Sequence, residues 1–340
     1  MPAITLLDCT FRDGGYYNSW DFDPQLTAEY LRAAAAAKVD AVEIGFRMFP
    51  QEQFHGAFAY STDDFLKTLP LPKGILIGVM VNASDILKHP AGADKALSLL
   101  FRPRSKSPVG LVRIAAHFRD IADCGAIAKG LKRLGYQVGF NLMQSTGKSK
   151  ETLTAAARTV AGWKSVDVLY FADSLGNMDG AGIAATLSAL REGWAGPIGV
   201  HAHNSLDQGV ANTLAAIEHG AAWVDSTILG MGRGPGNAPT EYLLIELERR
   251  GIRKSDMDPV FSLALGSFSK LQKQYGWGPN LLYYLAAVHG IHPTYVQTML
   301  GKGQYDRHHI IAAIESLRKS DASSFSTDHL EQALFSTEGS

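Results

Sequence analysis

The sharpest chemical signal in the sequence is a pair of histidines two residues apart. His201 and His203 stand near the end of an apolar run. Side chains two apart on a strand point the same way, so both imidazoles can face one ion. Imidazole is a common ligand of first-row metals, and Asp13, in the loop expected after the first strand, is the natural carboxylate partner. The pair predicts a metal site; the alternative is that both histidines only make hydrogen bonds.

Charged and glycine residues accompany these candidates. Arg12 comes just before the aspartate, and a fixed guanidinium beside an oxyanion stabilises developing negative charge. The alternative for Arg12 is a structural ion pair with Asp8 or Glu43. Two interpretations of Glu43 are equally supported: it is the partner in a buried ion pair, or it lies behind the residues that bind the ligand and supports them. The glycines of residues 230–236 allow close backbone approach to a ligand and present Asn237.

The elements that must position these residues alternate between strand and helix. Short β-branched runs recur about every thirty residues and are almost wholly apolar, as in parallel strands covered on both faces. The runs are residues 4–8, 41–45, 75–81, 111–115, 137–142, 166–172, 198–201 and 223–229. Helical patterns lie at residues 24–38, 124–134, 150–163, 180–191, 206–219 and 239–250. This alternation predicts a TIM (β/α)8 barrel. An open doubly wound sheet is the alternative, but no G-x-G-x-x-G follows the first strand.

The pattern changes after residue 255, where no further strand-like run occurs. Helices are predicted at residues 257–275, 280–288, 294–300, 307–318 and 327–333. We therefore expect a barrel domain of residues 1–255 and a helical C-terminal domain of residues 256–340, with Trp277 anchoring the second onto the first or capping the barrel's mouth. Polar residues follow several strands, and barrel enzymes build their active sites at the C-terminal ends of their strands.

Composition excludes several classes of function. The 340 residues are 46% hydrophobic and 19% charged, which is typical of globular proteins. Lys and Arg number 32 against 33 Asp and Glu, so no basic excess attracts nucleic acid or an anionic membrane. Two cysteines make no disulfide framework, no apolar run is long enough to span a membrane, and no signal peptide is recognisable. We expect a cytoplasmic protein.

Three motifs together resemble the DRE-TIM metallolyase superfamily. They are residues 8–14, 201–204 and 230–241. That superfamily includes hydroxymethylglutaryl-CoA lyase, isopropylmalate and homocitrate synthases, and 4-hydroxy-2-oxovalerate aldolase, to which these motifs are most similar. Residues 112–117 and 171–176 are similar too, so the resemblance extends over the whole barrel.

The resemblance implies a divalent metal, Mn or Mg ahead of Co or Zn, held by Asp13, His201 and His203. Asn237 is the matching fourth position, either as a ligand or just outside the ligand set. Arg12 would hold the enolate oxygen of a pyruvate-like moiety. The implied reaction is reversible cleavage of a carbon–carbon bond, which converts a 4-hydroxy-2-oxo acid into pyruvate and an aldehyde.

The base of that reaction is the main departure from the aldolase. The aldolase has a histidine three residues after the metal-binding aspartate, where this chain has Tyr16. A phenol with the usual pKa of about 10 is a poor base at neutral pH. Tyr16, His117 and a metal-bound water are the candidates, and Tyr16 can also be a packing aromatic.

Three further residues are candidates to bind substrate: Arg47, Glu43 and Ser174. Arg47 stands where the aldolase has a small, glycine-rich stretch, and it can bind a carboxylate or a phosphate of a different substrate. The alternative for Arg47 is a solvated charge at the rim.

Two other functions compete with the aldolase. One is an acyl-CoA-dependent condensing enzyme on the same scaffold, although the Claisen-type synthases have Gly-Glu-Gln after the aspartate and this chain has Gly-Gly-Tyr. The other is a barrel subunit whose main task is to dock a partner, since the aldolase that the chain resembles pairs with an aldehyde dehydrogenase. The helical C-terminal domain suits such docking or a homodimer, and a homodimer is what we expect.

Overall fold

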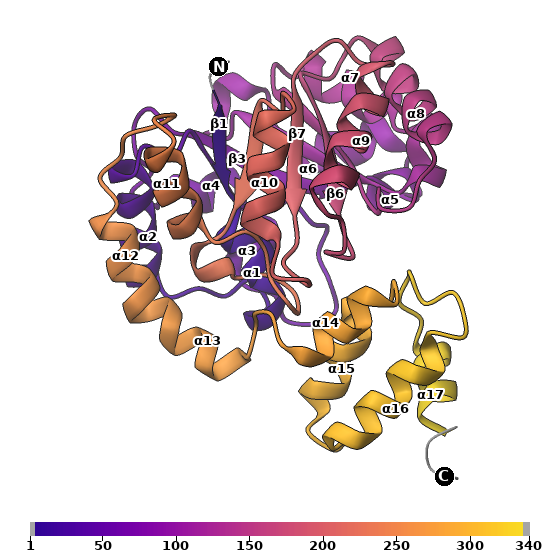
Figure 1. Cartoon of the computed structure of the whole chain (residues 1–340). Helices are drawn as coiled ribbons and strands as arrows, with labels where there is room; N and C mark the ends of the chain where they lie inside the picture. The colour runs from indigo at the N-terminus through magenta and orange to yellow at the C-terminus, as the bar shows by residue number, and fades with distance from the viewer. Residues whose placement is uncertain (1–3, 336–340) are drawn as a thin grey trace.

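A closed barrel of parallel strands forms the larger part of the computed structural model, which describes residues 4–335 (Figure 1). The strands are β1 (Thr5–Asp8), β2 (Ala41–Phe46), β3 (Leu76–Asn82), β4 (Leu111–Ala116), β5 (Gln137–Leu142), β6 (Val168–Asp173), β7 (Ile198–Ala202) and β8 (Trp223–Ser226). They lie in sequence order, and β8 pairs with β1 to close the barrel. The predicted TIM barrel is confirmed, and the open sheet is excluded.

Burial on both faces explains why these segments become strands. Every residue of β2, β4, β6, β7 and β8 is buried. One face of each strand packs against the surrounding helices, and the other lines the barrel interior. A strand covered on both faces gains most from a nearly continuous apolar sequence, which is the pattern that predicted it.

The predicted barrel helices are present. They are α2 (Pro24–Ala36), α7 (Gly125–Arg133), α8 (Lys150–Trp163), α9 (Gly180–Arg191), α10 (Gly209–Glu218) and α11 (Thr240–Arg249). Side-chain caps explain several of their starts. The carboxylate of Asp23 accepts hydrogen bonds from the backbone N–H groups of Gln25 and Leu26, and Ser149 and Asp179 cap α8 and α9 in the same way.

Shorter elements complete the connections. They are α1 (Thr10–Asn18), α3 (Ala57–Tyr60), α4 (Asp63–Leu66), α5 (Ala83–Leu87), α6 (Ala93–Leu100), η1 (Arg104–Lys106), η2 (Phe118–Asp123) and η3 (Ile228–Gly230). The expectation that Asp13 lies in a loop is wrong, because it lies in α1. Gly14 and Gly15 are poor helix formers and conceal this helix in the sequence. Both are required by packing: a Cβ on Gly15 would lie 2.0 Å from the ring of Trp20.

The first helix after the barrel packs beside α2 and α11, and the last helices of the chain lie beyond the C-terminal ends of the strands (Figure 1). The helices after the barrel are α12 (Asp258–Leu263), η4 (Ala264–Phe268), α13 (Ser269–Tyr275), α14 (Leu281–Val288), α15 (Pro293–Lys302), α16 (Arg307–Leu317) and α17 (Thr327–Phe335). Apolar residues of α12 and η4, together with Trp277, join the barrel's core. A separate core is built from residues between Tyr283 and Leu334. The division of the chain into residues 1–255 and 256–340 stays a prediction.

We call the helices after the barrel, residues 258–335, the helical part. Polar contacts join the helical part to loops at the barrel's mouth. Nε1 of Trp277 donates a hydrogen bond of 2.9 Å to the carbonyl of Leu229, and the indole is buried, so Trp277 anchors this part to the barrel. Nδ2 of Asn177, in the loop after β6, donates a hydrogen bond of 3.1 Å to the carbonyl of Ala287 in α14. The helical part is therefore joined to the loops that follow β6 and β8.

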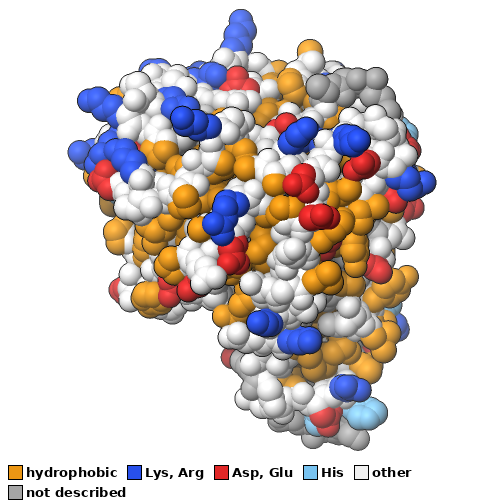
Figure 2. Space-filling view, turned by 90° about the vertical axis from the view of Figure 1, so that its left-hand side faces the viewer, with side chains coloured by type: hydrophobic (Ala, Val, Ile, Leu, Met, Phe, Trp, Pro, Cys, Tyr) orange, Lys and Arg blue, Asp and Glu red, His pale blue; other side chains and the backbone are white. Residues whose placement is uncertain are grey.

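The surface carries charges of both signs. Figure 2 shows Lys and Arg side chains mixed with Asp and Glu among hydrophobic ones, so this face offers no continuous basic surface of the kind that binds nucleic acid. Among residues 4–335, none of the helices combines the length and the apolar character that crossing a bilayer requires.

A buried carboxylate holds the glycine-rich loop between β8 and α11. Oε2 of Glu241 accepts a hydrogen bond of 3.0 Å from the backbone N–H of Leu229, a residue with φ 51°. Its other oxygen, Oε1, is buried and has no hydrogen-bond partner within the described residues. Burial raises the pKa of Glu241 from 4.5 to about 7.

Glu241 is expected to make stability depend on pH. Its carboxyl group keeps a proton in the folded state up to a pH of about 7 but loses it near 4.5 when unfolded. The stability it contributes is therefore fully present below pH 4.5 and is lost as the pH rises through about 7. Glu241→Gln removes this titration. The difference in thermal midpoint, variant minus wild type, measured by circular dichroism, should be roughly 2–4 °C larger at pH 8 than at pH 5.

Glu246→Gln on the same helix is the matched control. Hydrogen bonds from Arg249 lower the pKa of Glu246, so this group does not titrate in that pH window. An equal difference from the wild type at both pH values for Glu241→Gln would contradict the prediction.

Candidate metal centre

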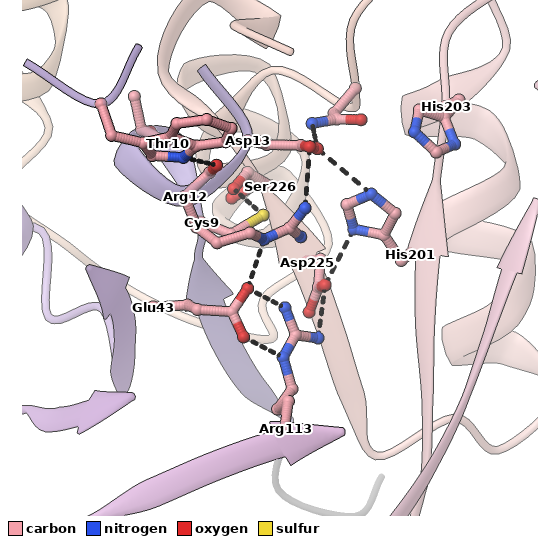
Figure 3. A network of polar contacts seen from close by, with 12 residues as sticks. Cys9, Thr10, Arg12, Asp13, Glu43, Arg113, His201, His203, Asp225 and Ser226 are labelled. Carbon is pink, nitrogen blue, oxygen red and sulfur yellow. Dashed lines mark hydrogen bonds and ion pairs between the residues drawn. The ribbon is translucent and has the colours of Figure 1, made fainter. Parts of the chain in front are cut away.

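Asp13, His201 and His203 meet at the C-terminal end of the barrel (Figure 3). Oδ2 of Asp13 lies 3.3 Å from Nε2 of His201. One ligand atom from each of the three residues lies within 4.8 Å of the others. Asp13 comes from α1, whereas His201 belongs to β7 and His203 directly follows it. The structure thus brings together the three residues that the sequence singled out as metal ligands.

Each histidine is oriented by an acceptor at its Nδ1. Nδ1 of His201 lies 2.9 Å from Oδ2 of Asp225, and Nδ1 of His203 lies 2.8 Å from the backbone oxygen of Asp173. A proton on Nδ1 of each ring leaves Nε2 as the nitrogen that can bind a cation, and in His201 this nitrogen faces Asp13 and can also carry a proton. Metal-binding histidines are usually held in this way. Asp225 was missed by the sequence analysis, because it lies inside a strand that reads as apolar core.

Asn237 completes the donor set. Its Nδ2 donates a hydrogen bond of 2.5 Å to Oδ2 of Asp13, so the amide lies against the candidate ligands. Its Oδ1 is buried and has no hydrogen-bond partner in the described part of the chain. A buried polar atom without a protein partner calls for an explanation, and a bound cation would supply one here. One carboxylate, two imidazoles and an amide oxygen fit a divalent cation.

Local charges set the protonation states that a cation requires. Burial opposes ionisation of Asp13, but Arg12, His201 and His203 together outweigh it and hold the pKa of Asp13 well below its usual range. Burial and the neighbouring His201 lower the pKa of His203 to about 3. Burial lowers the pKa of His201, but hydrogen bonds to Asp13 and Asp225 raise it overall. At neutral pH, Asp13 is an anion and His203 a neutral imidazole, as metal ligands must be.

Behind the candidate ligands, ion pairs fill the barrel interior (Figure 3). Arg113, fully buried on β4, donates from Nε and Nη2 to Glu43 at 2.6 and 2.7 Å, and from Nη1 to Asp225 at 2.7 Å. Arg12 donates from Nε to Glu43 at 2.6 Å and from Nη1 to Asp13 at 2.7 Å. Asp225 also contacts His201, so the two arginines and their acids form a closed ring through the histidine. We call these six residues, Arg12, Asp13, Glu43, Arg113, His201 and Asp225, the charge ring.

The charge ring decides between the alternatives for Arg12 and Glu43. Both oxygens of Glu43 accept hydrogen bonds from guanidinium groups, and its side chain is fully buried. Glu43 is therefore a buried ion-pair partner, and its part in substrate binding stays a prediction. Arg12 pairs with Glu43 and not with Asp8. Its Nη2 makes no hydrogen bond within the described residues and is left for a ligand.

Arg47 and Ser174 lie outside the charge ring. Arg47 pairs with the buried Asp63 and donates a hydrogen bond of 2.6 Å to the carbonyl of Leu100. These contacts are those of a structural ion pair, because they hold the β2–α3 connection against the end of α6. Oγ of Ser174 accepts a hydrogen bond of 2.9 Å from the backbone N–H of Gln144 and so joins the loops after β5 and β6. For both residues, a role in substrate binding stays a prediction.

The two candidate bases differ in their surroundings. His117 is half-buried at the end of β4, and burial together with Arg119 lowers its pKa. Tyr16 lies one helical turn after Asp13 on α1, and the guanidinium of Arg233 lies 4.3 Å from the centre of its ring. The Tyr16 hydroxyl makes no hydrogen bond within residues 4–335.

Tyr16 is also a packing aromatic. Its ring meets those of Trp20 and Phe46 edge-on, with centroids 4.8 and 6.1 Å apart. These contacts fix the ring without engaging the hydroxyl, so packing and a chemical role are compatible.

Comparisons with known proteins agree on a family. A family model described as HMGL-like matches residues 3–260. The chain is 32% identical over 253 residues to the 4-hydroxy-2-oxovalerate aldolase of Carboxydothermus hydrogenoformans, which covers 73% of this chain and 71% of that protein. It is 33% identical over 274 residues to the 4-hydroxy-2-oxovalerate aldolase of Chloroflexus aurantiacus, covering 77% of this chain and 74% of that protein.

Solved structures agree with this relationship. The N-terminal domain of a candidate aldolase from Bacteroides vulgatus superposes with a TM-score of 0.81 and 30% identity, over 91% of this chain and 100% of that one. The HMG-CoA lyase of Bacillus subtilis superposes with a TM-score of 0.65 over 82% of this chain and 96% of that one. At 15% identity, the lyase shares the fold alone.

Asp225 is expected to control metal affinity through His201. Asp225→Asn weakens the acceptor that orients the imidazole, so the dissociation constant for Mn²⁺, measured by calorimetry at pH 7, should rise by about 10- to 100-fold. Asp63→Asn is the matched control, because it breaks a buried carboxylate–guanidinium pair that does not touch either histidine. An unchanged Mn²⁺ affinity in a folded Asp225→Asn variant would contradict this role.

Proposed function

The chain belongs to the HMGL-like family, and on that basis we propose that it is a divalent-metal-dependent aldolase. It is a carbon–carbon lyase that interconverts a 4-hydroxy-2-oxo acid with pyruvate and an aldehyde through a pyruvate-type enolate. Relatives that are 4-hydroxy-2-oxovalerate aldolases support this reaction. The observation that carries it in this chain is the convergence of Asp13, His201 and His203 beside Arg12.

Asp13, His201 and His203 would hold the cation, with Asn237 as the fourth position. When bound, the cation supplies Lewis acidity toward the ketone and carboxylate oxygens of a 2-oxo acid. Mn or Mg is the expected metal, and the same donors accept Co or Zn.

Arg12 is preorganised for its part in this reaction. Its Nε and Nη1 are fixed by Glu43 and Asp13, so the orientation of the guanidinium plane is set before any substrate arrives. The remaining Nη2 would donate to the substrate oxygen that becomes the enolate. A donor that needs no reorientation stabilises developing charge most effectively.

Tyr16 is the proposed proton-transfer group. In the addition direction its phenol O–H donates a proton to the new alkoxide and becomes a phenolate, and in the cleavage direction that phenolate takes the proton back from the 4-hydroxyl. Two observations favour it over His117: it lies one turn from Asp13 on the same helix, and its hydroxyl is free of hydrogen bonds within the described residues.

The competing functions are less well supported. An acyl-CoA condensation is not favoured, because the relatives that cover most of the chain are aldolases. A barrel that only docks a partner is not favoured either, because the donor set and Arg12 are both in place. A homodimer, an aldehyde dehydrogenase partner and a cytoplasmic location stay predictions.

The pyruvate half of the reaction can be tested without knowing the aldehyde. Pyruvate in D₂O should exchange its methyl protons in the presence of the protein and Mn²⁺, as followed by proton NMR. Asp13→Asn and His201→Ala should lower the exchange rate at least 100-fold, because each removes a metal ligand. Asp63→Asn should exchange like the wild type. Absence of exchange in a protein with demonstrably bound Mn²⁺ would eliminate pyruvate as the nucleophile.

Tyr16→Phe tests the proton-transfer step. Cleavage of 4-hydroxy-2-oxopentanoate, coupled to reduction of the released pyruvate, should slow by about 10²- to 10⁴-fold, the usual worth of general acid–base catalysis. His117→Gln should change kcat by less than about tenfold. If His117→Gln were the more damaging change, the role of the base would pass to His117.

A further inference from the structure

A cavity of about 900 Å³ lies between the barrel's mouth and the helical part. One wall comes from α1 and the glycine-rich loop, and the other from α13, α14 and α15. Arg233 and Lys273 contribute positive charge to its lining, and none of the lining residues is acidic. Threonine, glutamine and tyrosine side chains supply most of its remaining polar groups.

Arg233 differs from the arginines of the charge ring because it has no counter-ion. Arg12 and Arg113 each pair with carboxylates. Within residues 4–335, no carboxylate pairs with Arg233, and its guanidinium rests on the face of Tyr16 at 4.3 Å. A half-buried guanidinium without a partner is suited to receive an anion from outside the chain.

The cavity begins at Tyr16, the proposed proton-transfer group. Tyr16 lines it and lies three residues after Asp13, so both side chains share one face of α1. Arg233 lies four residues before Asn237 in the same loop. A substrate whose 2-oxo acid end lies at Asp13 and His203 would therefore extend past Tyr16 toward Arg233.

We propose that this cavity binds the distal end of the aldehyde, and that this end carries a carboxylate or a phosphate paired with Arg233 and Lys273. The inference rests on the proposed aldolase reaction and names its second substrate as an anionic aldehyde. A two- or three-carbon neutral aldehyde would leave both cations unpaired. It would also leave most of the cavity filled with water, since pockets of this size hold considerably larger ligands.

Matched aldehydes test the proposal. Succinic semialdehyde presents a carboxylate, glyceraldehyde 3-phosphate a phosphate, and butanal neither. We expect kcat/KM for addition to pyruvate to be at least tenfold higher with one of the two anionic aldehydes than with butanal, and the better one identifies the anion. Arg233→Gln should lower kcat/KM for that aldehyde at least tenfold more than it lowers kcat/KM for butanal. Comparing two aldehydes within one variant cancels any loss of folded protein.

Lys273→Met should act in the same direction as Arg233→Gln. Lys270→Met is the matched control, because Lys270 lies on the same helix but does not line the cavity. An absent preference for both anions in the wild type, or an equal loss for anionic and neutral aldehydes in Arg233→Gln, would overturn the proposal.

Pyruvate exchange separates this inference from the proposed function. Exchange requires no aldehyde, so a protein that exchanges pyruvate protons but shows no anion preference would overturn the anionic substrate alone. A protein that binds Mn²⁺ and does not exchange would overturn the aldolase, and the anionic aldehyde with it.

Discussion

The charge ring is the constraint on which the rest of the barrel's mouth depends. Its contacts run from Arg113 to Glu43, Arg12, Asp13, His201 and Asp225, and then back to Arg113. Buried charges are stable only when each is paired, so removing one member leaves its neighbour uncompensated. Because the ring joins β2, β4, β7, β8 and α1, the orientation of the ligands is tied to the closure of the barrel itself.

The charge ring also explains why a cation suits this place. Three carboxylates face two guanidinium groups, so the ring carries one negative charge when His201 is neutral. A proton on His201 balances that charge, which is why hydrogen bonds to Asp13 and Asp225 raise its pKa. A divalent cation held in place of that proton would turn the net charge from minus one to plus one. Metal affinity is then coupled to pH through His201.

The sequence was informative where one local pattern decides the structure. Both faces of each strand are covered, so apolar runs located the barrel, and the two-residue period of β7 placed His201 beside His203. Glycines concealed α1, whose helical form depends on tight packing against Trp20. Arg113 and Asp225 could not be paired in advance, because they lie 112 residues apart on strands that read as apolar. No local pattern reports a partner at that distance.

The glycine-rich loop makes the helical part a component of the site. Toward the barrel the loop presents Asn237 to Asp13, and toward the cavity it presents Arg233. The carbonyl of Gly234 in the same loop accepts a hydrogen bond of 3.0 Å from the backbone N–H of Gly278 on the helical side. A shift of the helical part would therefore move Arg233 relative to the candidate metal ligands. The spacing between the two ends of a bound substrate is set by this loop, and so by how the helical part packs on the barrel.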